Sequence, residues 1–377
     1  MSTPPSRARQ ALLSAVSLVG GVSLAIIPAS TLSIASRTYS TAEQGSVSVV
    51  LTASTFIGQL AFAILIESRL SSSGTERRVT YPRWLALVSL MASLAVALFS
   101  GNVVVLCLAL PVLIASLEVG RGVSVAERLD TREGWAAAAV GAGALLGVGV
   151  AYLGESWGFL PLVLGITAAT VIRSLPVGHT ASRPVPSVVG WVVTDVAITG
   201  VIYPVLNTLI LVSIGPVPAV LFAAISTVSG LLAIPLNFMR VRLLKAHSTV
   251  DIWVSAAAVL AATILIAAME FTGVLGFIFH GSWTVPATLV ALTIACLWRA
   301  GSLLTTLPFA ALRRNGHVRL LAVLRGACAL VTFLAGVAVL PLHSLTAVFV
   351  VMLLGELLQA ATYEVARRRL TTPPVAA

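Results

Sequence analysis

The chain has 377 residues, of which 58% are hydrophobic and 10% charged, and its mean hydropathy is +1.03. Soluble domains average about 45–50% apolar and about 25% charged residues, so these values exclude a soluble fold. The formal net charge of +10 does not indicate nucleic-acid binding, because the basic residues flank apolar stretches and form no single patch. We therefore expect membrane lipids around them, and no nucleic-acid partner.

About twelve apolar stretches approach the roughly 20 residues that a bilayer-spanning helix requires. The spans predicted in chain order are 11–36, 46–67, 83–100, 102–118, 134–153, 157–175, 187–213, 217–240, 251–271, 283–311, 318–340 and 344–366. A further apolar run between Phe271 and Gly281 is predicted to lie along the outer membrane interface.

The basic residues give the orientation of these spans. All but three of the 23 Lys and Arg residues fall in every second gap, the exceptions being Arg37, Arg299 and Arg325. Short basic loops remain in the cytoplasm. The pattern predicts a multi-pass protein of the cytoplasmic membrane with both termini in the cytoplasm.

A proline-rich stretch from Val177 to Ser187 is the best candidate linker, and it separates six predicted spans from six. We therefore predict an all-α fold of about twelve transmembrane helices, arranged as two six-helix bundles around a central cavity. The predicted bundles comprise residues 1–180 and 181–377. Pro28 and Pro204 occupy equivalent positions in the two halves, and each is predicted to break its helix.

Three charged residues lie deep within predicted spans. Arg299 is about halfway along its span, where an isolated charge costs at least about 2.5–3.5 kcal/mol and usually faces a protein interior or an aqueous cavity. Glu356, in the last span, lies at a similar depth and is the obvious partner for Arg299 or Arg325. Arg325 is nearer the cytoplasmic end of its span, from where its side chain can reach the interface. Arg299 is therefore either a substrate-binding residue or one member of a helix-locking ion pair.

Asp195 begins a polar stripe that continues through Thr199, Tyr203 and Asn207 and is not expected to face lipid. Asp195 and Glu356 are the candidates for H+ or Na+ coupling or for an ion pair. The sequence contains no Walker lysine motif, no His-Glu-x-x-His and no nucleophile elbow. It therefore predicts a transporter and not an enzyme, with no catalytic residue, metal ligand or cofactor.

Two segments resemble a known family. Arg37, Glu43 and Gly45, between the first two spans, match an arginine and a pro-glu-glu-tyr-gly loop of O-antigen and polysaccharide flippases in the multidrug/oligosaccharidyl-lipid/polysaccharide exporter superfamily. The segment 277–283, Phe-Ile-Phe-His-Gly-Ser-Trp, is similar to the leu-phe-gly stretch ahead of the tenth span in that family. The likeness in spacing and hydropathy covers nearly the whole chain.

This resemblance implies a cationic cavity that opens alternately to either side while a polyprenyl-diphosphate-linked saccharide crosses for cell-envelope glycan assembly. On this basis the expected substrate-binding residues are Arg299, Arg325, Arg37, Asn207 and Tyr203. Arginine suits a diphosphate because its planar guanidinium donates several hydrogen bonds and stays charged. Glycosyltransferases or a polymerase of the same pathway are the expected protein partners.

Two alternatives remain open. The first is an ion-coupled drug or metabolite antiporter, although the acidic residue typical of the first span in multidrug extrusion proteins is absent. The Gly-x-x-x-Asp-Arg-x-Gly-Arg-Arg pattern expected for the major facilitator type is likewise missing from Glu67 to Arg78. The second is a non-transporting scaffold of a glycan synthesis complex, which would not require Arg299 to face water.

Overall fold

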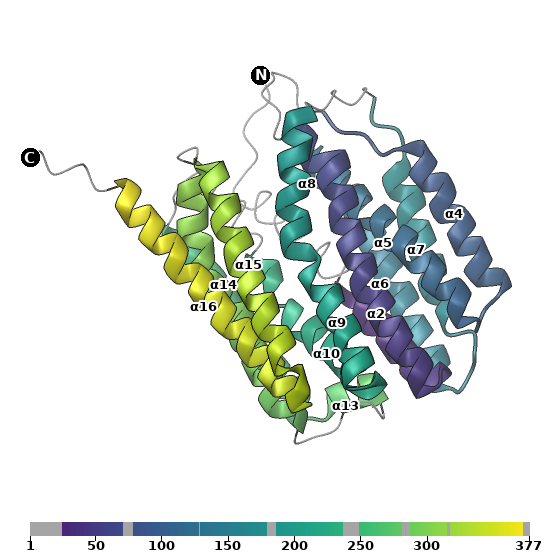
Figure 1. Ribbon diagram of the computed structural model, residues 1–377. Helices are drawn as coiled ribbons and strands as arrows, with labels where there is room; N and C mark the ends of the chain where they lie inside the picture. Colours follow the sequence, from purple (N-terminus) through teal and green to yellow (C-terminus); the bar gives the residue numbers. More distant parts are fainter. Residues whose placement is uncertain are drawn as a thin grey trace, which may run out of the picture. The chain divides into compact units, whose positions relative to one another are not determined.

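The computed structural model describes residues 25–70, 78–127, 129–178, 186–236, 249–280, 283, 287–314 and 317–371. Regular secondary structure in these ranges is entirely helical (Figure 1). The chain divides into two compact units. Unit 1 comprises Met1–Pro204 together with Ile278–His280, and unit 2 comprises Val205–Phe277 and Gly281–Ala377. The boundary at residue 180 and the two six-helix bundles stay predictions.

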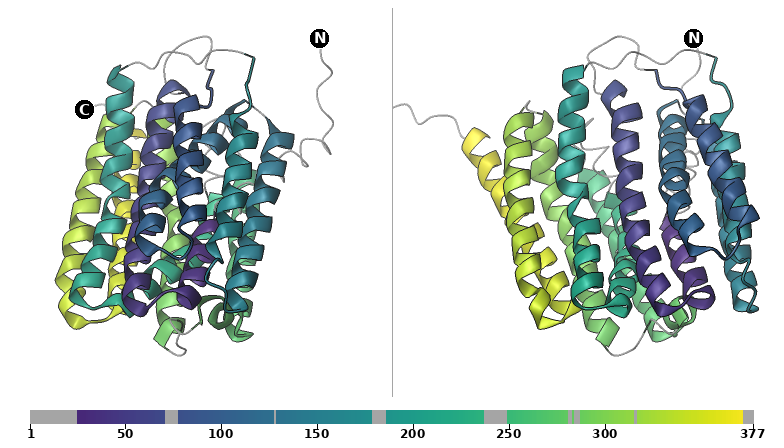
Figure 2. Two further views of the ribbon diagram at one scale, coloured as in Figure 1. Left: turned by 90° about the vertical axis from the view of Figure 1, so that its right-hand side faces the viewer. Right: turned by 45° about the vertical axis from the view of Figure 1, so that its right-hand side comes forward.

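Unit 1 begins, within the described residues, with a helix over residues 25–38. The elements that follow are α2 (Thr41–Phe62), the π-helical turn η1 (Ala63–Glu67), α3 (Ser68–Leu70), α4 (Arg83–Leu98), α5 (Val103–Ala126), α6 (Asp130–Tyr152), α7 (Phe159–Ser174) and α8 (Pro186–Gly200). α2 packs against α5, α6 against α7, and α4 against both α5 and α7. These helices, purple to teal in Figures 1 and 2, lie side by side with roughly aligned axes.

Unit 2 is built mainly on a long helix, α14, with α16 and α10 packed against it. Its elements are most of α9 (Ile202–Ser213), α10 (Pro216–Gly230), α12 (Thr249–Phe271), most of α13 (Val274–Phe279), α14 (Ala287–Arg314), α15 (Val318–Val339), the 3-10 turn η3 (Leu340–Leu342) and α16 (Leu345–Thr371). The first residues of α9 and the last of α13 belong to unit 1. α16 also packs against α15. Facing residues of α14 and α16 therefore meet along much of their length.

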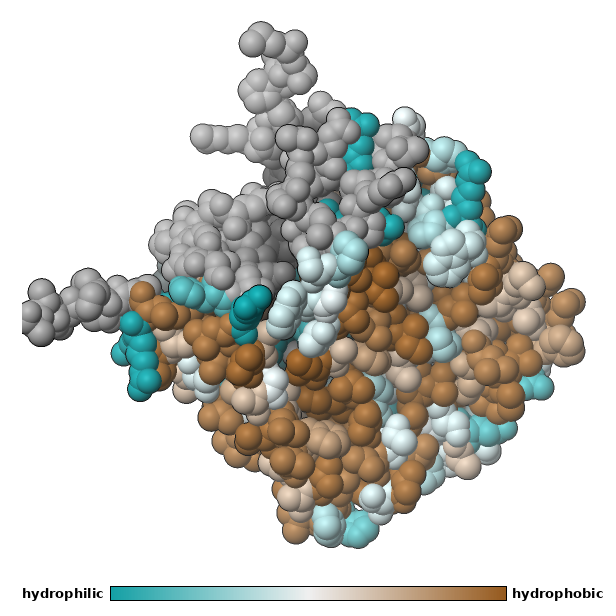
Figure 3. Space-filling model, turned by 45° about the horizontal axis from the view of Figure 1, so that its top comes forward, coloured by the Kyte–Doolittle hydropathy of each residue, from teal (hydrophilic) through white to brown (hydrophobic). Residues whose placement is uncertain are grey.

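The helices have the length and composition of membrane spans. Seven are long and apolar enough to cross a bilayer within the described residues, and they are Thr41–Glu67, Val103–Ala126, Asp130–Tyr152, Val189–Ser213, Thr288–Leu312, Arg319–Leu342 and Leu345–Leu370. Four shorter apolar helices are Arg83–Leu98, Phe159–Ser174, Pro216–Gly230 and Ala256–Phe271. On the face drawn in Figure 3, apolar residues predominate among those described. Leu108 and Leu145 are 73% and 76% exposed, as expected for side chains that contact lipid.

Three predicted elements differ in the structure. The span predicted to end at residue 118 continues as α5 to Ala126, so Arg121 belongs to a helix and not to a loop. The span predicted over 187–213 is interrupted at Val201, because Pro204 cannot donate to the carbonyl one turn earlier and its ring crowds that carbonyl. The helix around Pro28 is continuous from residue 25, and the preceding turn lies outside the described residues.

The apolar run after Phe271 forms α13, and one of its faces packs into the protein. Leu275 and Phe279 are fully buried, whereas Val274 and Phe277 are exposed. The run therefore does not lie wholly on the surface, and its place relative to the membrane stays a prediction.

Glycines bring α6 and α7 unusually close. A Cβ atom added at Gly143 would lie 2.6 Å from the carbonyl oxygen of Pro161 and 2.9 Å from the Cα of Gly165. One turn later, a Cβ at Gly147 would lie 2.7 Å from the carbonyl oxygen of Gly158. Small residues four apart allow helix backbones to touch, which is how helices associate in membranes without a hydrophobic driving force.

We expect Gly143→Leu to separate α6 from α7 and to reduce the yield of folded protein severalfold. The added side chain has no room because the atoms it meets are backbone, which cannot swing away. Gly141→Leu is the matched control, since nothing lies within 4 Å of its Cβ position. Thermal unfolding and size-exclusion profiles of both variants in detergent measure the effect. Equal stability of the two would show that the close approach is not required.

Candidate functional site

The polar residues predicted at depth in unit 2 lie on α14, α15 and α16. The guanidinium carbon of Arg299 lies 4.0 Å from the centre of the Trp298 ring, which is close enough for a cation–π interaction. Trp298 is almost buried, and its ring packs at 6.5 Å against Phe349 of α16. Phe349 in turn stacks at 5.3 Å on Phe222 of α10. The half-buried Arg299 therefore rests on an aromatic cluster drawn from three helices.

Glu356 extends from α16 toward α14. Its Oε1 atom accepts a hydrogen bond of 2.7 Å from the hydroxyl of Thr305, whose single proton is shared with the carbonyl of Ser302 at 3.0 Å. Gly301 of α14 also lies close to Glu356, since a Cβ at this position would be in ordinary van der Waals contact with the Cγ of Glu356, at 3.6 Å. Thr306 donates to the carbonyl of Ser302 as well. The helix predicted to carry Arg299 therefore does present a polar stretch to Glu356, and a direct pair between Glu356 and either arginine stays a prediction.

Arg325, on α15, has an aromatic contact of the same kind. Its guanidinium carbon lies 5.7 Å from the ring centre of Phe309 on α14. Phe309 packs at 6.3 Å against the fully buried Tyr363 of α16, whose hydroxyl accepts a hydrogen bond from Gln359. Each of the two deep arginines of unit 2 is thus supported by an aromatic residue of α14.

The stripe that begins at Asp195 does not continue as one helical face. Asp195 is half-buried on α8, whereas Tyr203 and Asn207 belong to α9 beyond the interruption at Val201. Asn207 is completely buried and lies in unit 2, and Tyr203 lies in unit 1. The side chain of Thr199 lies outside the described residues. Roles for Asp195, Tyr203 and Asn207 in binding or coupling stay predictions.

Arg37 lies in unit 1 and contacts backbone. One of its terminal nitrogens donates to the carbonyl of Ser33 at 3.0 Å and to the carbonyl of Ile278 at 2.8 Å. The Ser33 hydroxyl donates to the same Ile278 carbonyl at 2.6 Å. The guanidinium carbon also lies 6.0 Å from the Tyr152 ring. The geometry gives Arg37 a positioning role that the sequence prediction did not include.

We expect Arg37→Met to lower the free energy of unfolding by about 1.5–3 kcal/mol, the usual contribution of hydrogen bonds to a charged group. Arg319→Met, at the exposed start of α15, serves as the control. Thermal unfolding in detergent measures both. If Arg37→Met unfolds like the wild type yet transports poorly, Arg37 acts on the substrate and the contact with Ile278 is dispensable.

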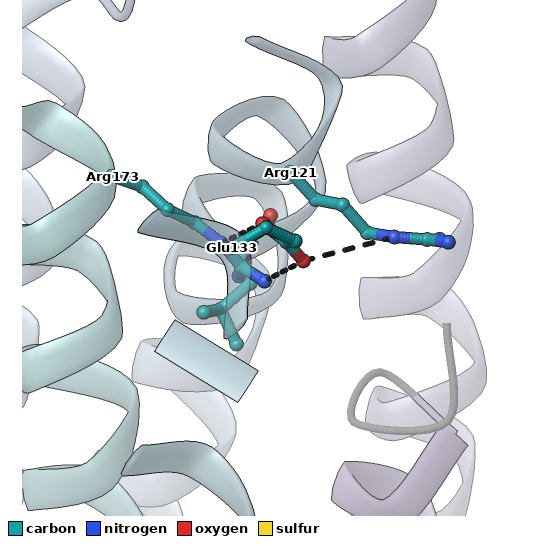
Figure 4. A network of polar contacts seen from close by, with 4 residues as sticks. Arg121, Glu133 and Arg173 are labelled. Carbon is teal, nitrogen blue, oxygen red and sulfur yellow. Dashed lines mark hydrogen bonds and ion pairs between the residues drawn. The ribbon is translucent and has the colours of Figure 1, made fainter. Parts of the chain in front are cut away.

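Sequence analysis missed a charged network buried in unit 1 (Figure 4). Arg173 of α7 is completely buried and donates to both carboxylate oxygens of Glu133 of α6, at 2.9 and 2.5 Å. It also donates to the carbonyl of Leu117 at 3.4 Å, and Arg121 of α5 lies 4.0 Å from Glu133. A Cβ at Gly120 would lie 2.9 Å from the Cδ of Arg173, so the glycine makes room for the arginine. These arginines were counted among the basic loop clusters, whereas Arg173 is completely buried in α7 and Arg121 lies within α5. The cytoplasmic position of the clusters stays a prediction.

A second buried chain of hydroxyls lies beside this network. The Tyr81 hydroxyl is 2.7 Å from that of Ser116, which is 3.0 Å from that of Thr170. Burial raises the pKa of Tyr81 to about 12, so the hydroxyl keeps its proton at physiological pH. The chain links the segment before α4 to α5 and α7. One sequence signal for this region is Glu118, the last residue of the predicted span, followed by Arg121 at helical spacing just beyond it.

Comparison with known proteins identifies the fold. No protein-family model matches the sequence, and no curated protein matches it. An inward-facing structure of a multidrug resistance MATE family transporter of the MOP superfamily aligns with a TM-score of 0.57 and 13% identity, covering 94% of this chain and 98% of that chain. A MATE structure in complex with MaL6 has a TM-score of 0.48 and 11% identity over 96% of this chain and 86% of that chain. An outward-facing structure of a multidrug resistance MATE family transporter has a TM-score of 0.46 and 12% identity over 95% and 94% of the two chains.

The first of these matches shows that the chain has a MATE-like fold. An all-α, multi-pass membrane protein was predicted from hydropathy, and the fold confirms that class. At 13% identity the likeness concerns the fold alone. The substrate, the polysaccharide flippase family and the orientation of the termini must be argued from this chain's own residues.

Proposed function

We propose that the protein moves a polyprenyl-diphosphate-linked saccharide across the cytoplasmic membrane by alternating access, for cell-envelope glycan assembly. The observation that carries this proposal is the placement of Arg299 at mid-helix in α14, half-buried on an aromatic cluster, in a chain with a MATE-like fold. A permanent charge at that depth is costly unless it faces protein or water. A function that requires a cation there accounts for its presence.

The charge balance of this part of unit 2 suits an anionic substrate. Arg299 and Arg325 are two positive charges on α14 and α15, and Glu356 is one negative charge on α16. A diphosphate offers oxygen acceptors to both guanidinium groups, and arginine remains charged in every functional state. The polyprenyl chain can stay in lipid against the exposed apolar side chains while only the polar head crosses.

The aromatic support contributes to binding by holding Arg299 in place. A guanidinium stacked on Trp298 has fewer accessible rotamers, so less side-chain entropy is lost when a phosphate binds. One carboxylate oxygen of Glu356 accepts a hydrogen bond from the Thr305 hydroxyl. We propose Glu356 and Asp195 of α8 as candidates for H+ or Na+ coupling. Glycosyltransferases or a polymerase of the same pathway are the proposed partners.

A drug or metabolite antiporter is the second candidate, and the match to a multidrug resistance MATE structure favours it. The two candidates differ in the charge they require. An antiporter for cationic drugs needs acidic residues at the substrate site. The deep charged residues of α14, α15 and α16 are instead two arginines, Arg299 and Arg325, and one glutamate, Glu356. This difference supports the anionic substrate.

The proposal is tested by depleting the protein from its native host and locating the lipid-linked glycan. We expect the glycan to accumulate on the cytoplasmic leaflet, where it is protected from an external glycosidase in intact cells and cleaved after permeabilisation. Drug sensitivity is measured in the same cells. Unchanged glycan export together with increased drug sensitivity would reject the flippase in favour of the antiporter.

A further inference from the structure

Unit 1 contains a cavity that none of the predicted site residues lines. Its volume is about 30 Å3, which leaves room for about two water molecules. The lining residues come from the first helix, α2 and α5, and are Ile27, Pro28, Thr55, Ile114, Leu117 and Glu118. Four of the six are hydrocarbon side chains or a proline, so Glu118 and Thr55 are the groups that could bind water there.

Glu118 is held against α2 by close packing. A Cβ at Gly58 would lie 3.1 Å from the Cγ of Glu118 and 3.2 Å from a methyl carbon of Ile114, which is tighter than an ordinary contact. The stem of Glu118 therefore packs closely against α2. Thr55, one turn before Gly58, donates its hydroxyl to the carbonyl of Leu51 and keeps lone pairs for a water molecule.

Glu118 lies on α5, the helix that also carries Arg121 of the network drawn in Figure 4. The charges that act on it are those of Arg121, one turn further along α5, and Arg173 of α7. Glu133 of α6 completes the group. Further charged residues on elements packed against α5 are Glu43 of α2, Glu67 of η1, Arg83 of α4, and Asp130 and Arg132 of α6. The side chains of the first helix and of α2 that line the cavity are uncharged.

The two glutamates of the group differ in their hydrogen bonds. Both oxygens of Glu133 accept hydrogen bonds from Arg173, which is a bidentate contact. Glu118 instead faces the cavity, where water can deliver a proton or remove one. With both glutamates ionised, they balance Arg121 and Arg173. Protonation of Glu118 leaves one positive charge in excess, where Arg121 and Arg173 already repel each other.

We propose that Glu118 and the cavity beside it form a proton-binding site that makes the conformation of unit 1 sensitive to pH. A hydronium ion in the cavity transfers H+ to a carboxylate oxygen of Glu118. One O–H bond of the hydronium breaks, the O–H bond of the protonated Glu118 forms, and a neutral water molecule is left in the cavity. The excess charge then favours a rearrangement that moves Arg121 away from Arg173. Coupling of this step to transport rests on the proposed function, whereas the proton site does not.

A proton fits this site better than a metal cation. Na+ and Ca2+ prefer several oxygen ligands, and the cavity offers the carboxylate of Glu118 and the hydroxyl of Thr55 among its lining side chains. Two nearby arginines also repel a metal ion, whereas a proton neutralises the carboxylate and leaves no further charge to solvate.

Infrared difference spectroscopy of the full chain in liposomes tests the site without any substrate. Lowering the pH should produce the carbonyl stretch of a protonated carboxyl group, and Glu118→Gln should lose that band. Glu155→Gln, in the exposed turn between α6 and α7, should retain it. If Glu118→Gln does not fold, Glu118→Asp should shift the band. A band that persists unchanged in the Gln or Asp variant, or no titrating band in the wild type, overturns the proposal.

Coupling is measured separately, by following transport of a polyprenyl-diphosphate-linked saccharide at several pH values. Glu118→Gln should transport at a rate that no longer depends on pH. If the wild type carries no such saccharide but Glu118 still titrates, the proton site stands and the proposed function fails. If the wild type transports and Glu118→Gln keeps the pH dependence of the rate, coupling through Glu118 is rejected.

Discussion

Arg173→Met should lower the free energy of unfolding of the protein by about 3–5 kcal/mol, the cost of breaking a buried ion pair by removing one partner. Arg173 is completely buried, and Glu133 is only 2% exposed. The variant therefore leaves the Glu133 carboxylate buried beside Arg121 alone, 4.0 Å away. The folded yield in detergent should fall with the stability.

A double variant distinguishes loss of the ion pair from loss of packing. Arg173→Met combined with Glu133→Leu removes both charges, and replacing a buried pair by apolar groups of similar size is often neutral. We expect the double variant to recover most of the stability. Arg368→Met is the control, because Arg368 binds Glu364 at the exposed end of α16, where such pairs contribute about 0–1 kcal/mol.

Thermal unfolding and the monodisperse fraction in size-exclusion chromatography measure all four proteins. A single variant as stable as the Arg368 control would mean that the buried pair contributes nothing. A double variant as unstable as Arg173→Met would show that the network needs charge at these positions, for example to balance Arg121.

Arg299→Ala should reduce transport of the lipid-linked saccharide by about 10- to 100-fold, which corresponds to the loss of one or more hydrogen bonds to a charged group. Arg299→Lys should recover part of the rate, since lysine keeps the charge but lacks the planar guanidinium that pairs with a phosphate and stacks on Trp298. Arg325→Ala should have a smaller effect, because this residue is closer to the end of its helix.

Transport is measured in proteoliposomes with a fluorescent polyprenyl-diphosphate-linked saccharide, at matched amounts of folded protein. Arg319→Ala, at the exposed start of α15, should transport like the wild type. Normal transport by Arg299→Ala would remove Arg299 from the substrate site. Equal losses in Arg299→Ala and Arg319→Ala would indicate a general effect of positive charge and not a binding residue.

The sequence by itself determined the class of protein and the position of most helices. Long apolar stretches predict helices because lipid offers no partner for backbone N–H and C=O groups, and this constraint acts on every span alike. The positions of several turns could also be predicted from the sequence. Gly101, Gly154 and Gly215 all lie in predicted gaps, and each adopts a positive φ that side chains with a Cβ rarely tolerate. The deep position of Arg299 could likewise be seen from its distance to the ends of the span.

Tertiary structure alone decided which charges are buried and with which partner. Arg173 and Glu133 lie 40 residues apart, and both occur near span ends, where hydropathy cannot distinguish a loop charge from a buried one. Their pairing depends on the approach of α6 and α7, which the glycines at Gly143 and Gly165 permit. Arg37, for which substrate binding stays a prediction, donates to the carbonyl of Ile278, 241 residues further along the chain. Such contacts arise from packing between distant helices, and no local pattern of hydropathy or charge encodes them.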